Sequence, residues 1–419
     1  MEGCSKTSAG AASGLPDDPL VEILSRVPVK SVCRFKWVSK AWCDLIADPD
    51  HRKKLPQAMQ GLFVETGEVS EVDDTKLARI IFSFIDLTVR SVPLDIDPSF
   101  SFLTEPTGIE TFVFLDSCNG LILLGNRQEP SDLSVGTYMV CNPTTKQWSA
   151  MPACGSCDTL SHTYLAFDPA VSSHFHLSHT YLAFDPAVSS HFHLVQFQMP
   201  DVDMEIVLLH VYSSETGTWS QNQIDEQEEQ GQLEGWHHQF TLEVLDYHCA
   251  FVNGFLHLIV WGPDRQHILV VDIQGKARRM ITVPGMADGS QRHSITCYLG
   301  QYQGHLHCVT IDSTDQNNDK LSTWVLQDYD TQEWVLKSTV NSLDIFGETG
   351  VTPEYQVVDI HQVCNVLFFF QQLTSELIAY NMDRKEVSVI VTFKDYKCRS
   401  DFARYVPYFS ESPALTNKH

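Results

Sequence analysis

The chain has 419 residues, of which 43% are hydrophobic, 28 are basic and 53 are acidic, giving a formal net charge of −25. This charge argues against a nucleic acid as a direct partner, since phosphate binding relies on clustered Lys and Arg. No stretch reaches the roughly 18 unbroken apolar residues of a membrane span, so no membrane partner is expected. Residues 1–14 are small and polar and lack the apolar centre of a secretory signal, so we expect a cytoplasmic or nuclear protein.

Residues 15–51 carry the pattern of short amphipathic helices. Leu20, Ile23, Leu24 and Val27 recur at the spacing of one helix face. Pro28 should end this helix, because proline cannot donate the backbone hydrogen bond that a helix interior needs. The pattern predicts a first helix of about two turns.

Two more helices should follow this one. The second runs from Ser31 to Val38, and Ser39 is a candidate N-cap for a third that ends before Asp48. Three helices of two to three turns bury little apolar surface. A unit of this size usually needs a partner surface to be stable.

This block resembles the F-box, the motif that ties substrate receptors to a Skp-type adaptor in cullin-based ubiquitin ligases. The resemblance rests on Leu15-Pro16, Ile23-Leu24, Val27-Pro28, Arg34-Phe35, Val38-Ser39-Lys40 and Trp42. Trp37 and Cys43 depart mildly from the family pattern. The resemblance implies that the adaptor contacts Leu15, Pro16, Leu20, Ile23, Leu24, Pro28, Val32, Arg34, Phe35, Val38 and Trp42, and that a cullin scaffold joins through the adaptor.

From about residue 80 the helical period gives way to short apolar runs between turn residues, which is typical of an all-β domain. Turn-plus-strand elements begin at Asn119-Gly120 and Asn253-Gly254, pairs that supply the positive φ of tight hairpin turns. A second strand in each unit leads to Trp148, Trp219 or Trp334, or to Met280 or Val387 in the same slot. The repeat of fifty-odd residues, with a first strand near residues 81–94, predicts about six propeller blades.

One spacing in the repeat is longer than the others, between Trp148 and Trp219. The 17-residue segment 160–176 is repeated without change as residues 177–193. Such a perfect copy indicates a recent duplication or a gene-model artefact. We expect it to add a hairpin or a long surface loop to one blade, since loops absorb insertions at low cost.

The repeat region resembles the F-box-associated, kelch-like β-propeller domains of plant F-box proteins. The segments CNGLILL, CNPTTKQW and YSSETGTW carry this resemblance, and the paired glycines of kelch repeats are mostly missing. Residues 405–412 could supply the strand that closes the ring. A two-sheet sandwich is the alternative, but it would not naturally give a repeat of this length.

No pattern of catalytic or metal-binding residues stands out. Cys154 and Cys157 form a lone CxxC without a second pair at zinc-ribbon spacing. His237, His238 and His248 have no spaced Cys or carboxylate partner. Phosphate-binding, nucleophile-elbow and HExxH motifs are also missing. We therefore expect no catalytic residue, no cofactor and no metal.

The sequence thus predicts a small three-helix F-box followed by an all-β, propeller-like domain. The expected boundaries are a disordered segment 1–14, the F-box 15–55, a linker 56–80, the propeller 81–412 and a disordered tail 413–419. The resemblance implies a non-enzymatic substrate-recognition subunit of a Skp–cullin–F-box ubiquitin ligase whose propeller binds an unidentified protein target. The alternative is a propeller that binds carbohydrate or acts as an enzyme, with the F-box incidental.

Overall fold

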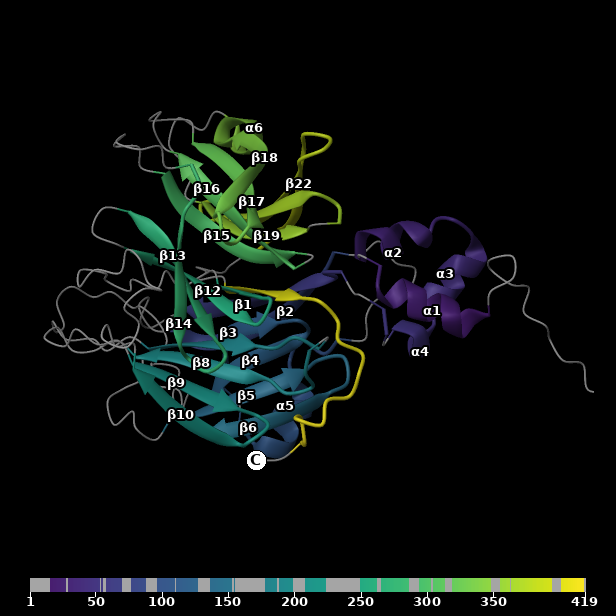
Figure 1. Cartoon of the computed structure of the whole chain (residues 1–419), viewed down its shortest axis with the longest axis vertical. Coiled ribbons are helices and arrows are strands. Elements are labelled where there is room, and N and C mark those ends of the chain that lie inside the picture. The colour runs from purple at the N-terminus through teal and green to yellow at the C-terminus, as the bar shows by residue number, and fades with distance from the viewer. Residues whose placement is uncertain are drawn as a thin grey trace, which may run out of the picture.

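The computed structural model of the protein describes residues 16–27, 29–52, 54–55, 58–69, 77–87, 96–109, 111–126, 136–152, 154, 178–186, 188–198, 208–223, 249–261, 265–285, 294–302, 304–312, 319–347, 355–361, 363–393 and 401–417. These residues form a helical N-terminal unit and a ring of six β-sheets (Figure 1). The predicted fold class, a helical F-box followed by a β-propeller of six blades, is confirmed.

The N-terminal unit contains α1 (Asp17–Ser25), α2 (Val29–Phe35) and α3 (Lys40–Ala47), followed by the single turn α4 (Pro49–Arg52). Ser39 caps α3 as predicted, because its hydroxyl oxygen accepts a hydrogen bond of 3.2 Å from the backbone N–H of Trp42. The turn α4 was not indicated by the apolar spacing. None of the described helices is long and apolar enough to cross a membrane.

The ring consists of five four-stranded blades and one three-stranded blade, all antiparallel. Blade 1 is β2 (Leu77–Asp86), β1 (Gly61–Val69) and β23 (Asp401–Tyr405). Blade 2 is β3 (Phe112–Cys118), β4 (Leu121–Asn126), β5 (Thr137–Asn142) and β6 (Gln147–Pro152), and blade 3 is β7 (Ser178–Ala183), β8 (His193–Gln198), β9 (Leu208–Ser213) and β10 (Thr218–Gln223). Blade 4 is β11 (Cys249–Val252), β12 (Phe255–Trp261), β13 (Gln266–Asp272) and β14 (Ala277–Thr282), and blade 5 is β15 (Ser294–Tyr302), β16 (His305–Asp312), β17 (Lys320–Asp328) and β18 (Glu333–Asn341). Blade 6 is β19 (Tyr355–His361), β20 (Val366–Gln371), β21 (Glu376–Asn381) and β22 (Glu386–Thr392); two short helices, α5 (Ser101–Thr107) and α6 (Ser342–Phe346), lie in connections between blades.

A cluster of buried apolar side chains fills each junction between neighbouring blades. Alternation along a strand lets one blade serve two junctions. Phe369 on β20 lies in the junction with blade 5, in one cluster with Val309 of that blade. Its neighbour Phe370 lies in the junction with blade 1, in one cluster with Leu62. The junction between blades 6 and 1 is filled like the others, so the ring is closed.

The closing strand is β23, which pairs with β1 from Gly61 opposite Tyr405 to Glu65 opposite Asp401. The prediction of a closing strand at residues 405–412 is therefore corrected, since only Tyr405 belongs to β23 and the chain then continues across blade 2 without strand structure. Two physical reasons account for the error. The charged residues of β23 hide its apolar pattern, and Pro407 cannot donate to a sheet ladder.

The predicted linker 56–80 is also corrected, because it contains β1 and the first residues of β2. Glycine and acidic residues gave this segment the composition of a linker. However, Leu62 and Phe63 are fully buried. A side-chain oxygen of Glu65 accepts a hydrogen bond of 2.7 Å from the backbone N–H of Phe114 in blade 2. Pairing on both edges outweighs the weak strand propensity of these residues.

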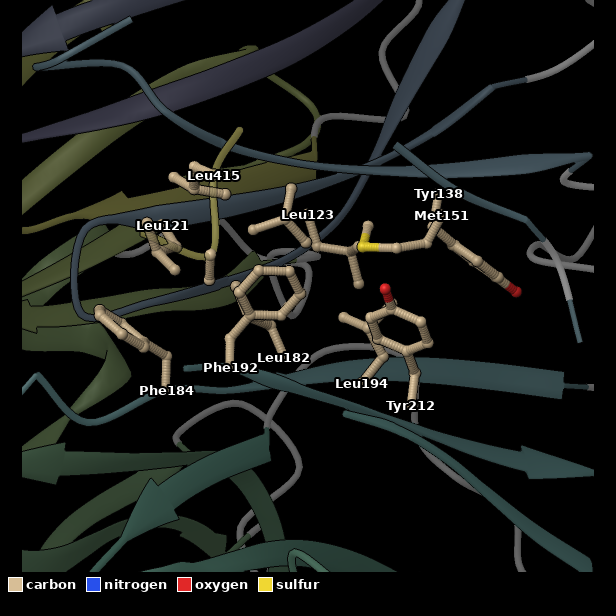
Figure 2. Packing of buried hydrophobic residues seen from close by; sticks show 12 residues of the cluster. Leu121, Leu123, Tyr138, Met151, Leu182, Phe184, Phe192, Leu194, Tyr212 and Leu415 are labelled. Atoms are coloured by element: carbon tan, nitrogen blue, oxygen red, sulfur yellow. The ribbon is translucent and has the colours of Figure 1, made fainter. Parts of the chain in front are cut away.

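The predicted disordered tail 413–419 is corrected for residues 413–417, which pack against the propeller. Ala414 and Leu415 are 9% and 3% exposed and belong to the cluster between blades 2 and 3. Figure 2 shows Leu415 in this cluster, on the side of Leu121 and above the rings of Phe184 and Phe192. The apolar pair is too short to give a recognisable strand or helix pattern.

The duplication falls in blade 3. Its second copy supplies β7 and ends at His193, the first residue of β8. The first copy and the N-terminal segment 1–14 lie outside the described residues, so the predicted extra hairpin or loop stays a prediction.

The first and third turns of each four-stranded blade lie at one end of its strands, which we name the turn face. In an antiparallel blade, the first and third connections lie at the same end of the sheet. Turns of neighbouring blades are bonded to each other there: the side chain of Asn119 donates to the carbonyl of Phe184 at 2.7 Å, and that of Asn253 donates to the carbonyl of Gly304 at 3.0 Å. The turn face includes residues 119–120, 143–146, 214–217, 253–254, 273–276, 329–332 and 382–385.

Candidate adaptor surface and central channel

The core of the F-box uses three of the eleven predicted adaptor residues. Leu20, Leu24 and Val32 are at most 5% exposed. They pack with the other buried side chains Val21, Leu45, Ile46 and Leu55. These three residues therefore stabilise the helical unit itself, and the helical spacing could not separate them from contact residues.

Two further predicted residues, Phe35 and Trp42, lie at the margin of this core. Their ring centroids are 5.4 Å apart and the rings meet edge to face at 61°, a favourable aromatic arrangement. Both are half-buried. They can support the core and still offer an edge to a partner.

The other predicted adaptor-contact residues that the structure describes are exposed. Ile23 is 51% exposed and Val38 is 65% exposed, and Pro16 and Arg34 are also exposed. Leu15 and Pro28 lie outside the described residues. Exposed side chains of this size on a unit with a complete core are available for a partner.

Trp37 extends this exposed set, at 90% exposure. Its backbone N–H donates to the carbonyl of Arg34 at 3.0 Å, and that of Val38 donates to Phe35 at 3.1 Å, so an ordered turn after α2 presents both side chains. The prediction treated Trp37 only as a departure from the family pattern. A large aromatic residue outside the apolar stripe of its helix was the signal that could have identified it.

The chain enters the propeller at the turn face. The backbone N–H of Gln60 donates to the carbonyl of Tyr405 at 2.9 Å, where β1 begins and β23 ends. The glycine turn of blade 2 lies beside this point, because a Cβ atom on Gly120 would come within 2.5 Å of the carbonyl oxygen of Val406. The F-box helices accordingly lie to one side of the ring, next to blade 1 (Figure 1).

A cavity of about 160 Å³ lies between the innermost strands of all six blades, β23, β3, β7, β11, β15 and β19. Asp359 on β19 accepts a hydrogen bond of 2.6 Å from the hydroxyl of Tyr298 on β15. Its other oxygen lies 3.9 Å from Nε of Arg404, whose Nη1 donates to the carbonyl of Gln301 at 3.2 Å. These charged and polar groups contact one another across three blades, which supports a structural role for them.

Asp116 ties three blades together in the same cavity. Its Oδ2 accepts a hydrogen bond of 2.8 Å from the N–H of Leu182 and lies 3.6 Å from the thiol sulfur of Cys249. Burial, only partly offset by these hydrogen bonds, raises the pKa of Asp116 to about 6. The folded state therefore holds this proton more tightly than the unfolded chain does.

The contribution of Asp116 to the free energy of unfolding should be largest below about pH 4 and should be lost as the pH rises to about 6. We expect Asp116→Asn to remove this pH dependence. The change in the free energy of unfolding that it removes is at most about 3 kcal/mol. Urea unfolding of both proteins at pH 4.5 and pH 7 checks it: the stability of the variant relative to the natural chain should rise with pH. Parallel pH profiles would contradict the expectation.

Within the described part of the chain, no group of three or more His, Cys, Asp or Glu side chains could hold a metal ion. Cys154 is buried, with its sulfur 3.2 Å from Nδ1 of His210. Its CxxC partner Cys157 and the three histidines His237, His238 and His248 lie outside the described residues. In the cavity, burial and the nearby charge of Asp116 raise the pKa of Cys118 to about 12, so that thiol stays protonated at neutral pH.

Comparison with known proteins agrees with this architecture. The F-box domain matches residues 12–54, and the F-box associated beta propeller domain matches residues 97–408. F-box protein At5g49610 of Arabidopsis thaliana is 24% identical over 339 residues, which cover 81% of each chain. F-box protein At5g07610 of the same plant is 29% identical over 224 residues, which cover 52% of this chain and 47% of that relative, about half of its length. The chain therefore belongs to the F-box proteins that carry an F-box-associated β-propeller domain.

Proposed function

We propose that this chain is the substrate-recognition subunit of a Skp–cullin–F-box ubiquitin ligase, acting in the cytoplasm, the nucleus or both. The F-box contacts the Skp-type adaptor through Pro16, Ile23, Arg34, Val38 and Trp37, with Leu15 and Pro28 as further contacts, and the edges of Phe35 and Trp42 complete this surface. The propeller binds a protein target. Leu20, Leu24 and Val32 support the contact from the core.

The observation that carries this proposal is the contrast between the two parts of the chain. The propeller closes its ring with six filled junctions. The F-box has a complete core and still exposes Ile23, Trp37 and Val38. Apolar surface of this kind favours a docking partner, and membership of the F-box proteins supports a Skp-type adaptor as that partner.

In this role the chain contributes proximity rather than chemistry. Holding a target near a charged ubiquitin carrier raises the effective concentration of its lysines and converts an encounter between two molecules into a local one. The polar groups described in the central cavity bind one another, so no observation favours the alternative of an enzymatic or carbohydrate-binding propeller.

Deleting residues 1–55 is expected to abolish adaptor binding and to leave target binding intact. The deletion ends there because Met59 is 3% exposed in the junction between blades 6 and 1, and the carbonyl of Gln60 accepts a hydrogen bond of 3.0 Å from Leu87. The measurement is affinity purification of both forms from proteasome-inhibited plant cells, followed by quantification of the captured proteins and of their ubiquitin conjugates.

True targets should bind both forms and carry ubiquitin chains only with the full chain. The proposal fails if the full chain does not capture a Skp-type adaptor, or if captured proteins are ubiquitylated equally with the deleted form.

A further inference from the structure

The C-terminal segment shows how a short peptide can fill a cleft of this propeller. After β23 the chain crosses the turn face of blade 2, and Ala414 and Leu415 become buried between blades 2 and 3. Leu415 lies in one cluster with Leu121 at the start of β4 and Val140 near the end of β5 (Figure 2 shows Leu415 and Leu121). Leu415, with the smaller Ala414 beside it, is thus the main apolar anchor of this segment.

Polar bonds on both sides hold the same segment in place. The backbone N–H of Ser412 donates to the side chain of Gln147 in blade 2 at 2.9 Å, and its hydroxyl donates to the carbonyl of Ser190 in blade 3 at 3.1 Å. Asn417 forms two bonds with Trp148: its N–H donates to that carbonyl at 2.7 Å, and its Oδ1 accepts from the N–H at 2.8 Å. The segment therefore packs on the propeller as a bound peptide would, with an apolar anchor at Leu415 and polar contacts on both sides.

The corresponding cleft on blade 4 is open on the turn face, next to blade 5. The repeat places Phe255 where blade 2 has Leu121, since each follows an Asn-Gly turn and begins the second strand. It places Val270 where blade 2 has Val140, two residues before the strand ends. Among the described residues no segment occupies this cleft, whose volume is about 760 Å³.

The walls of this cleft combine an apolar floor with a charged rim. Phe255, Val270 and Tyr329 provide apolar surface. Arg279 and Asp330 form an ion pair of 3.2 Å at the rim, and the Asp330 side chain is 89% exposed. An exposed pair of this kind contributes little stability, so Asp330 can exchange its partner for a basic group of a ligand at low cost.

We infer that the cleft between blades 4 and 5 docks a short extended segment of the target protein, with a leucine-type side chain on Phe255 and Val270 and a Lys or Arg beside Asp330. This inference rests on the proposed receptor role and assigns a surface and a peptide chemistry to it. The aliphatic anchor follows from the intramolecular precedent of Leu415. The basic neighbour follows from the exposed carboxylate and from the net charge of −25 of the chain.

A degenerate peptide library tests the inference directly. The probe is a set of immobilised synthetic decapeptides with leucine or serine fixed at the centre and all other positions varied one at a time. The full chain in complex with its adaptor is applied to the set. It should select leucine over serine and prefer Lys or Arg at a neighbouring position.

Two variants and one control locate the binding. Ile273→Arg places a charged, bulky side chain in the cleft wall and should weaken binding about tenfold or more. Asp330→Lys should change the preference from basic to acidic neighbours, which a loss of folding would not do. Leu373→Arg makes the same kind of change as Ile273→Arg at a side chain that is 71% exposed in the β20–β21 turn, and it should bind like the natural chain.

Three results would overturn the inference: no preference for leucine, equal binding by Ile273→Arg and the natural chain, or an unchanged preference in Asp330→Lys. Adaptor binding is measured on the same preparations. Intact adaptor binding with no selective peptide binding contradicts the peptide site and leaves the receptor role standing. Loss of adaptor binding in the natural chain contradicts the receptor role itself.

Discussion

A chain that ends after residue 400 is expected to lose the folded propeller, because β23 is the strand that closes the ring. Its removal takes away the whole ladder with β1, from Gly61–Tyr405 to Glu65–Asp401. It also takes Ala403 and Tyr405 out of the junction between blades 1 and 2, and Phe402 out of the junction between blades 6 and 1. Two junctions would then be exposed to water at once.

Side chains of β23 reach well beyond its own blade. The hydroxyl of Tyr405 contacts the hydroxyl of Thr144 in blade 2. Arg404 donates to the carbonyl of Gln301 in blade 5. Domains of this kind are stable by only about 5–15 kcal/mol, so the loss of contacts to several blades should remove the cooperative unfolding transition.

Thermal unfolding followed by circular dichroism, together with limited proteolysis, measures this effect. The matched control is a chain that ends after Tyr405, which keeps β23 and loses the segment with Leu415. Because one buried leucine contributes about 2–5 kcal/mol, the control should unfold cooperatively at a lower temperature. A chain ending after residue 400 that unfolds like the control would show that β23 does not close the ring.

The sequence predicted those features of the fold that repeat or that follow a regular spacing. The apolar spacing of Leu20 and Leu24 gave the first helix, and the hydroxyl of Ser39 gave the start of the third. The Asn-Gly turns and the tryptophans predicted the blades. One blade cannot bury both of its apolar faces alone, so similar strands and turns recur in each blade around the ring.

Features that depend on one non-local partner could not be predicted in the same way. β1 resembles a linker in composition, and its place is set by pairing with β2 and with β23 from the far end of the chain. Arg404 gives β23 a polar sequence pattern, and its partners Gln301 and Asp359 come from distant blades, so the sequence alone does not mark this segment as a strand. The helical period likewise could not separate core from contact residues in the F-box, since Ile23 and Leu24 are adjacent on a helix of only nine residues.

The second large effect that we expect is the loss of adaptor binding on substitution of Ile23 or Leu24. The physical reason differs between these two residues. Leu24 is 1% exposed in the F-box core, so Leu24→Asp buries a charge without a partner and should unfold the helical unit. Ile23 is 51% exposed and Val38 is 65% exposed. The double variant Ile23→Asp, Val38→Asp should therefore keep the fold and lose the contact.

Isothermal titration of the purified full chain with a Skp-type adaptor measures the contact, and hydrogen exchange of α1–α3 measures the fold. Hot-spot residues at the centre of an interface contribute about 2 kcal/mol or more each, so loss of both should weaken adaptor binding about 1,000-fold, with unchanged protection of the helices. Leu24→Asp should lose both binding and protection. Leu336→Asp, at a side chain that is 49% exposed on β18, is the control and should change neither. Adaptor affinity within threefold of the natural chain in the double variant would move the contact away from Ile23 and Val38, and Trp37→Ala would then be the next substitution to measure.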